Sequence, residues 1–371
     1  MKIYYDPVPE GSMAANVYLK NMKDTLTLGE TVTFGIAFKN ISKTPFDSIK
    51  VKVAIIDQNN VSHTLFVNKQ RPIITGDTIV VQCEFNTMNY SGNNLLFIDV
   101  NTGNDQKEQY FFNNFVYKNF YVVPDSKNPL LDVTFDGVHI LNRDIVSAKP
   151  HIQIKLKDES SYLLLNDTSL TSVQVQYPNG TTRTYNFNSD TLRFIPATSG
   201  SDNTATVEFT PEFTQQINPD GDVYELIVKG KDRSGNKAGT IAYRVAFTVI
   251  SKPMISNVLN YPNPFSTSTA FVFTITGSEV PQNVRIQILT VTGKIVREIT
   301  MNELGPLHIG RNITEFKWDG TDQYGQKLGN GVYLYRVITS MNGKAMDKYK
   351  SKDDNTDKYF NNGYGKMYLM R

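Results

Sequence analysis

The stretch WDGTDQYGQKLGNGVYLYRV, residues 318–337, places two glycine turns next to an alternating strand. The Asp-Gly pair at 319–320 and the Asn-Gly pair at 330–331 favour tight reversals, because both residue types accept a positive φ. In the segment that follows, the side chains of Tyr333 and Tyr335 share one face. The stretch therefore predicts hairpins between strands that each bury one face.

Carboxylates beside glycines can also form a calcium loop. Here Asp319, Asp322 and Gly325 occupy positions 1, 4 and 7 of the segment DGTDQYG. This misses the 1-3-5 ligand spacing and the sixth-position glycine of a helix–loop–helix calcium loop. The residues therefore favour turns over a metal site.

The same alternation recurs along the whole chain. Segments with a period of two lie at 31–38, 49–55, 173–177, 224–230 and 284–289, and Asn, Asp, Gly or Pro residues bound them. We find no convincing amphipathic helix. Many short strands separated by turns indicate an all-β fold of antiparallel, immunoglobulin-like β-sandwiches, because two sheets must cover each other's apolar faces.

Two proline-containing seams divide the chain. Pro124 follows the aromatic strand FFNNFVYKNFYVV, and Pro253 follows YRVAFTVI. Proline cannot continue a sheet ladder, so both positions favour linkers. We predict three consecutive sandwiches, at 1–124, 125–252 and 253–371.

The charge balance is nearly neutral. Lys and Arg number 38 and Asp and Glu number 36, which leaves a formal net charge of +2. A nucleic-acid-binding surface normally needs an excess of one sign, so we expect no nucleic-acid partner. The single cysteine, Cys83, excludes an intramolecular disulfide and a cysteine-based zinc site.

No run of the sequence approaches the roughly 18 consecutive apolar residues of a membrane-spanning helix. Met1 is followed by KIYYDPVPEG, which lacks the basic and then apolar pattern of a signal peptide. Two alternatives follow: a cytosolic protein, or an internal piece of a longer one. The segment YYDPVPEG favours the second, because it resembles a linker that leads into a domain.

Catalytic motifs are missing from the sequence. Cys83 shares a strand face with Val81 and Phe85, and a cysteine among apolar neighbours is expected to be a core residue rather than a thiolate nucleophile. No GxSxG elbow, phosphate-binding glycine loop or HExxH motif is present. We therefore predict that this chain is not an enzyme and requires no cofactor.

Four histidines are dispersed without metal-ligand spacing: His63, His139, His151 and His308.

One acidic set in the middle domain suits a calcium site. It consists of Asp132, Asp136, Asp158 and Glu159, in the segments LLDVTFDG and LKDESS. Calcium takes carboxylate oxygens, and loops at the domain junctions of extracellular sandwiches can supply them. The residues would converge if both loops lie at one end of the sandwich. The competing interpretation is a pair of solvated turns, and the sequence leaves both open.

The last domain carries several motifs in a definite order. NYPNPF (260–265) comes first, VRIQILTVTGKIVREI (284–299) follows, and FKWDGTDQYGQKLGNGVYLYRV (316–337) completes the set. This order resembles the immunoglobulin-like domain of flagellar hook-capping proteins and the C-terminal domains of proteins exported by the type IX secretion system of Bacteroidota. The resemblance implies a structural or recognition motif made of Pro262, Asn263, Pro264, Phe265, Gly293, Trp318, Asp319, Gly320, Asn330, Gly331, Tyr333 and Tyr335.

The first domain is similar to an adhesion-related sandwich module of bacterial surface proteins, through LTLGETVTFGIAFKNIS (26–42) and VNTGNDQKEQYFFNN (100–114). Together with LLDVTFDGVHILNRDIVSAKPHI (130–152), the domain order resembles the C-terminal region of gingipain-like cysteine peptidases, in particular the sortase-like components of type IX secretion. The resemblance covers essentially the whole chain. It implies a caspase-like catalytic domain upstream of Met1, so no catalytic residue transfers to this sequence.

This resemblance implies a cell-surface, outer-membrane or extracellular location as part of a longer secreted protein. It also implies protein partners among the outer-membrane components of type IX secretion, with the last domain serving in export, attachment or partner docking. The alternative function is that of a cell-surface adhesin or a carbohydrate-binding module. Tyr261, Phe265, Tyr333 and Tyr335 would then form a sugar platform, although aromatic strand residues more often pack in cores.

Overall fold

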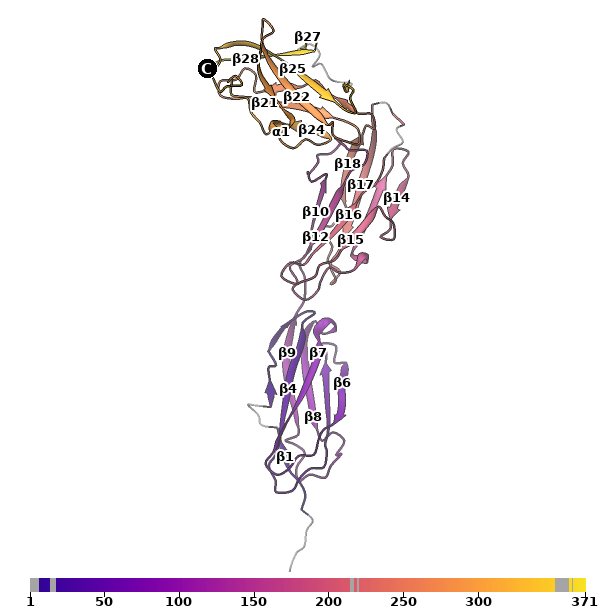
Figure 1. Ribbon diagram of the computed structural model, residues 1–371. Coiled ribbons are helices and arrows are strands. Elements are labelled where there is room, and N and C mark those ends of the chain that lie inside the picture. The colour runs from indigo at the N-terminus through magenta and orange to yellow at the C-terminus, as the bar shows by residue number, and fades with distance from the viewer. Residues whose placement is uncertain (1–6, 14–17, 214–216, 219, 351–359, 362) are drawn as a thin grey trace, which may run out of the picture. The chain divides into compact units, whose positions relative to one another are not determined.

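The computed structural model describes residues 7–13, 18–213, 217–218, 220–350, 360–361 and 363–371 of the chain. Over these residues almost all regular structure is β-strand (Figure 1). The helical segments in this part of the chain are single turns: η1 (Thr87–Asn89), η2 (Thr168–Leu170) and α1 (Met301–Leu304). The predicted all-β fold is confirmed. None of the helices in the described ranges has the length and apolar character needed to cross a lipid bilayer.

The chain forms two compact units. The first unit contains Met1–Lys127, Glu159–Leu164 and Ser199–Asn203. The second unit contains Asn128–Asp158, Leu165–Thr198 and Thr204–Arg371.

The first unit is a β-sandwich. One sheet has the strand order β3-β9-β8-β5-β6, and in the other sheet β4 pairs with β1 and β2 along one edge and with β7 along the opposite edge. The strands of the five-stranded sheet are β3 (Thr25–Thr27), β9 (Phe115–Val123), β8 (Gly92–Val100), β5 (Lys50–Ile56) and β6 (Ser62–Lys69). Those of the four-stranded sheet are β1 (Gly11–Ser12), β2 (Leu19–Lys20), β4 (Thr31–Asn40) and β7 (Thr78–Asn86).

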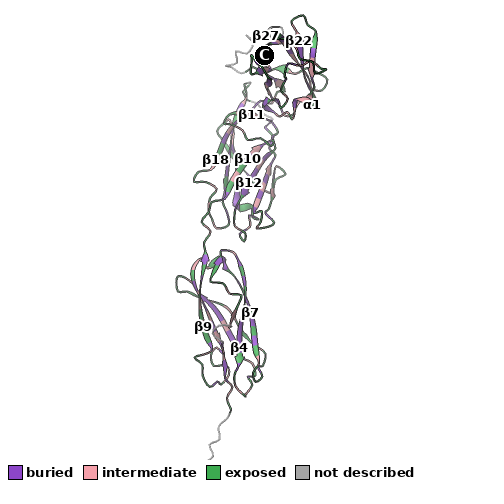
Figure 2. Cartoon of the chain, turned by 90° about the vertical axis from the view of Figure 1, so that its left-hand side faces the viewer, coloured by how far each residue is buried: buried purple, intermediate pink, exposed green. Residues whose placement is uncertain are grey.

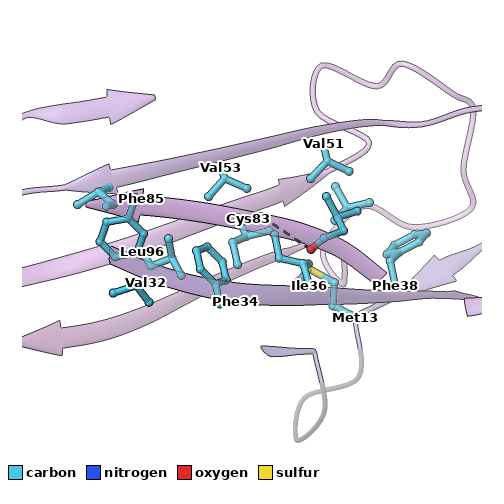
Figure 3. Packing of buried hydrophobic residues seen from close by; sticks show 14 of the residues in the cluster. Met13, Val32, Phe34, Ile36, Phe38, Val51, Val53, Cys83, Phe85 and Leu96 are labelled. Atoms are coloured by element: carbon cyan, nitrogen blue, oxygen red, sulfur yellow. Dashed lines mark hydrogen bonds between the residues drawn. The ribbon is translucent and has the colours of Figure 1, made fainter. Parts of the chain in front are cut away.

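The core of this sandwich follows from the period of two in its strands. Every second residue of β7 is buried and the others are exposed, as the alternating bands in Figure 2 show. Phe34 and Phe38 of β4 pack in one cluster with Val51 and Val53 of β5 (Figure 3). Two sheets that each present an apolar face must cover one another to remove those faces from water.

The second unit contains two further pairs of sheets. Its first pair has the strand orders β10-β12-β16-β15 and β11-β18-β17-β13-β14. The core between these sheets includes Val133, Ile154, Val175 and Phe247, all almost fully buried. The strands are β10 (Leu130–Phe135), β11 (Asp144–Val146), β12 (Ile152–Lys157), β13 (Thr171–Gln176), β14 (Thr182–Tyr185), β15 (Leu192–Ile195), β16 (Thr204–Phe209), β17 (Asp222–Gly230) and β18 (Tyr243–Val249).

The second pair of sheets in this unit is formed by the end of the chain. One sheet has the order β20-β21-β19-β26, with β24 also on β21, and the other has the order β23-β22-β25-β28-β27. Phe271, Phe273, Ile286 and Trp318 belong to the core between them. The strands are β19 (Met254–Ile255), β20 (Leu259–Tyr261), β21 (Ala270–Ile275), β22 (Asn283–Thr290), β23 (Ile295–Ile299), β24 (Gly310–Ile313), β25 (Gly331–Ser340), β26 (Asp347–Lys348), β27 (Phe360–Asn361) and β28 (Tyr364–Leu369).

Short parallel pairings depart from the antiparallel expectation. β3 pairs in parallel with β9, β11 with β18, and β19 with β26. In each pair, a strand near the start of the sequence of its sandwich pairs with a strand near the end of that sequence. The alternation of side chains specifies which face of a strand is buried but carries no information on the direction of its partner, so the sequence did not predict these pairs.

The predicted domain boundaries fall between strands. β9 ends at Val123 and β10 begins at Leu130, and the division between the two compact units follows Lys127. The other boundary lies between Val249 of β18 and Met254 of β19, inside the second unit. The division into three domains at 1–124, 125–252 and 253–371 stays a prediction.

We expect limited proteolysis to cut first within residues 124–129. Neither seam contains a strand, and in the first Asp125 accepts from Lys127 N at 3.3 Å within the segment itself. The seam at 250–253 is instead bonded to residues outside it: Gly277 N donates to Ile250 O at 2.9 Å, and the Thr276 hydroxyl donates to Lys252 O at 2.7 Å. A protease needs a locally unfolded segment, so the less bound seam is cut earlier. Mass spectrometry of the earliest fragments measures this order, and a first cut at 250–253 would contradict it.

Candidate functional site

The site that gathers most of the motif residues is built around β28. This strand pairs antiparallel with β25 from Gly331 opposite Leu369 to Tyr335 opposite Gly365. Met367 and Leu369 point into the core and are almost fully buried, while Lys366 and Tyr368, which alternate with them, are exposed. The period of two thus gives β28 one face in the core and one face in solvent.

The NPF segment, residues 263–265, lies along the other edge of β28. Phe265 N donates to Tyr368 O at 3.0 Å, and Met370 N donates to Phe265 O at 2.9 Å. The Asn263 side chain accepts from Tyr368 N and donates to Lys366 O, both at 3.0 Å. The last strand is therefore hydrogen-bonded along both edges.

Trp318 fixes the hairpin that flanks this strand. Its indole is 1% exposed and lies with ring centroids 5.6 Å from Phe265 and 5.7 Å from Tyr333. The indole Nε1 donates to Thr321 O at 2.8 Å, so the ring's polar group is satisfied inside the core. One side chain therefore connects the NPF segment, β25 and the turn that begins at Asp319.

The acidic residues of this hairpin act as turn formers. Asp319 Oδ1 accepts from Thr321 N and Oγ1, and Asp322 Oδ1 accepts from Tyr324 N and Gln326 N. Gly320 has φ +76°, and a Cβ there would lie 2.8 Å from Leu369 Cδ2. These contacts support the interpretation as turns, and only glycine fits between the turn and β28.

The Asn-Gly pair at 330–331 is not the predicted tight reversal. Gly331 is already the first residue of β25, and Asn330 is not among the described residues with positive φ. The Asn330 side chain instead accepts from Arg371 N at 2.9 Å and donates to Arg371 O at 3.1 Å. The Arg371 guanidinium also donates to Leu328 O and to Asp319 O. The motif thus clamps Arg371, two residues beyond the end of β28.

Two motif residues serve other parts of the sandwich. Gly293, with φ +87°, lies in the predicted turn between β22 and β23. Tyr335 is 2% exposed and packs against Phe271, and its ring fills the space in which a Cβ on Gly365 would stand. Burial raises the pKa of the Tyr335 hydroxyl. The structure therefore brings the NPF segment, the Trp318 hairpin and Asn330 together, and places Gly293 and Tyr335 in supporting positions.

The predicted calcium set does not meet at one point. Asp136 accepts from His151 N just before β12, whereas Asp158 follows the last residue of that strand, which at about 3.3 Å per residue is some 20 Å away. Asp132 pairs with His139 at 2.7 Å, and Glu159 pairs with Lys127 at 3.4 Å. The prediction failed because Asp136 and Asp158 lie at opposite ends of β12.

The burial of three aromatic rings supports the interpretation of core residues over the alternative of a sugar platform in the last domain. Phe265, Tyr333 and Tyr335 are 3%, 8% and 2% exposed, because they form the core beside Trp318 and Phe271. Of the four aromatic residues only Tyr261, at 74%, offers its ring to solvent.

Cys83 has the environment of a core residue. Its side chain is 4% exposed and lies in the cluster with Phe34, Ile36 and Val53 (Figure 3). Burial raises the pKa of the thiol to about 12, so it remains protonated at neutral pH. The thiol contacts the carbonyl oxygen of Val81, with Sγ and O 3.8 Å apart. These immunoglobulin-like sandwiches fit a non-catalytic chain.

Comparison with known proteins gives one family match. Residues 259–343 match the family model of the FlgD Ig-like domain, which agrees with the sandwich described there. No curated protein matches the sequence.

Several solved structures are similar at low identity. Dimeric latent PorU from Porphyromonas gingivalis has 17% identity and a TM-score of 0.25 over 98% of this chain and 34% of that chain. The CARDB domain of the PF1109 protein from Pyrococcus furiosus, in complex with di-metal ions, has 17% identity and a TM-score of 0.27 over 33% of this chain and 95% of that one. Salmonella alpha-2-macroglobulin has 9% identity and a TM-score of 0.20, over 100% of this chain and 24% of that chain. The chain thus spans about a third of the length of the PorU structure.

We expect Arg371→Ala to lower the free energy of unfolding of the last sandwich by about 1 kcal/mol, since it removes hydrogen bonds of the exposed guanidinium to two carbonyls. Trp318 is the only tryptophan, so its fluorescence during a urea titration reports on this sandwich. Lys366→Ala, which truncates an exposed side chain on β28, is the matched control and should leave the transition unchanged. Equal effects of the two variants would contradict the clamp.

We expect the Cys83 thiol to be unreactive toward a thiol reagent in the folded protein at pH 8 and fully reactive in denaturant, because the thiol is protonated and covered. Cys83→Ala should cost on the order of 1 kcal/mol of stability through the small cavity it leaves. Absorbance after reaction with Ellman's reagent measures the accessible thiol. Rapid reaction of the folded protein would show that the residue is not a core residue.

Proposed function

We propose that this chain is the non-catalytic region of a gingipain-like, sortase-type surface protein of type IX secretion, and that its last domain serves in export, outer-membrane attachment or partner docking. The partners would be outer-membrane proteins of the secretion system, and the location the cell surface or outer membrane. Any peptidase domain of such a protein would lie outside these residues.

One observation carries the proposal: the motif residues behind the resemblance converge on the last strand. The NPF segment hydrogen-bonds to β28, Asn330 bonds to Arg371 two residues beyond that strand, and Trp318 packs against Phe265 of the NPF segment. The match of residues 259–343 to the FlgD Ig-like domain supports the same relationship. A signal built in this way is a folded surface rather than a linear peptide.

The outer face of β28 offers a surface for a partner. Tyr368 is 43% exposed and lies directly opposite Val332 of β25, which is 37% exposed, and Met370 is 61% exposed just beyond the strand. Apolar and aromatic side chains exposed together on one sheet face are typical of protein interaction sites. We assign partner docking to this face.

One observation favours the alternative of adhesion or carbohydrate binding. Tyr110, Phe112, Phe115 and Tyr117 of the first unit are 56%, 72%, 47% and 53% exposed. Such a concentration of exposed rings suits a binding surface, and it lies on the first unit rather than on the last domain.

The test is a fluorescent protein, directed to the periplasm of a bacterium with type IX secretion and followed by the whole chain. We expect surface fluorescence with the intact chain and periplasmic retention when the chain stops at residue 252. Tyr368→Ser should reduce surface delivery because it removes the central exposed ring of the docking face. Fractionation and protease shaving of whole cells measure the location.

Tyr324→Ser is the matched control, because Tyr324 is 80% exposed on the Trp318 hairpin and lies outside β28. It should leave delivery unchanged. A reporter that stays in the periplasm with the intact chain would reject export by this domain and favour adhesion.

A further inference from the structure

Two carboxylates are buried together at one end of the first unit. Glu10, just before β1, is 6% exposed, and Glu108, in the loop between β8 and β9, is 7% exposed. Glu108 accepts from Gly11 N at 2.9 Å, and Glu10 accepts from Tyr110 N at 2.9 Å. Each glutamate therefore accepts a hydrogen bond from the segment that carries the other one.

Neither carboxylate has a positively charged partner among the residues that the structure describes. The other donors are neutral amides: Asn101 and Asn114 to Glu108, at 2.8 and 2.5 Å, and Asn113 to Glu10 at 2.8 Å. Burial raises the pKa of Glu108, and the charge of Glu10 raises it further, although the amide bonds oppose this. Buried charges are costly unless a counter-charge or a metal ion accompanies them.

Two amide oxygens at the same place have no donor. Asn114 is 2% exposed, and its Oδ1 has no hydrogen-bond partner; the same holds for Oδ1 of the partly buried Asn113. Each unpartnered oxygen belongs to an amide whose nitrogen donates to one of the two carboxylates, Asn114 to Glu108 and Asn113 to Glu10. A fully buried oxygen without a donor needs another positive partner.

We propose that Glu10, Glu108, Asn113 and Asn114 bind one calcium ion. The donor atoms are all carboxylate and amide oxygens, which hard cations prefer, and the set contains no histidine or cysteine of the kind that zinc selects. Calcium accepts irregular sets of carboxylate and amide oxygens, whereas magnesium demands a near-ideal octahedron and retains its waters. The ion supplies the positive charge that two buried acids lack.

The ion would fasten the segment before β1 to the rest of the first unit. That segment already bonds to the 101–114 loop through Gln109 N to Pro9 O, and to the end of β4 through Ile41 N to Glu10 O. Gly11 is pressed against the Phe38 ring, where a Cβ would stand 2.0 Å from Cζ. Calcium therefore stiffens the point at which the chain enters its first sandwich, independently of the function proposed for the last domain.

Calorimetry of the whole chain, stripped with a chelator and titrated with calcium chloride, tests the site. We expect one ion per chain, with affinity in the millimolar range or tighter, as in extracellular modules. Glu108→Gln should weaken binding about tenfold or more, because it removes one of two ligand charges. Glu84→Gln, a change of an exposed acid in the same sandwich, should leave binding unchanged.

A second variant guards against a Glu108→Gln protein that fails to fold. Asn114→Asp keeps the size of the side chain and adds a ligand charge, so it should tighten calcium binding while destabilising the calcium-free protein. Terbium gives a local readout, because Tyr110 lies beside Glu10 and can sensitise its luminescence. Tyr110→Leu should reduce that luminescence and preserve calcium binding. Absence of binding at 10 mM calcium, about tenfold above the weakest dissociation constants of such modules, overturns the proposal. Equal affinity of the wild type and both site variants also overturns it.

Discussion

The pairing of β28 with β25 is the interaction on which the last sandwich depends. Without β28, the buried side chains of Met367 and Leu369 would leave a gap in the core beside Trp318. β25 would also lose its neighbour from Gly331 to Tyr335 and present an open edge with unpaired backbone groups. Loss of one strand therefore affects both the apolar core and the hydrogen bonding of the sheet.

In the first unit, polar contacts rather than a long strand hold the segment before β1 in place. Its first strand, β1, has two residues and pairs with the end of β4, so strand pairing alone contributes little. Glu10 and Glu108 provide the additional bonds between this segment and the 101–114 loop. Such closure is sensitive to charge, because each buried carboxylate stabilises the segment only while its own charge is compensated. The segment before β1 and the last strand, β28, are thus held in place by different kinds of interaction.

Side-chain alternation made most of the fold predictable. It identified β4, β7 and β22 and placed Cys83 on a buried face. The role of Asn330 was not predictable, because the Asn-Gly signal is local while the bonds of Asn330 are to Arg371. Glu10 and Glu108 were not predictable as a pair for the same reason, because they meet at one end of the first unit but lie far apart in the sequence. Asp136 and Asp158 illustrate the converse error, since a single strand separates them.

The position of β28 also explains how a partner could distinguish the folded chain from an unfolded one. Val332 and Tyr368 come from strands whose alignment exists only after β28 has paired with β25, and Met370 is held beside Phe265 by a backbone bond. A partner that contacts these side chains together gains little from any one of them in an extended chain, because ordering the rest would cost conformational entropy. Its affinity therefore rises steeply when the sandwich closes. In the proposed function, recognition of this face and completion of the fold would be coupled through the same strand.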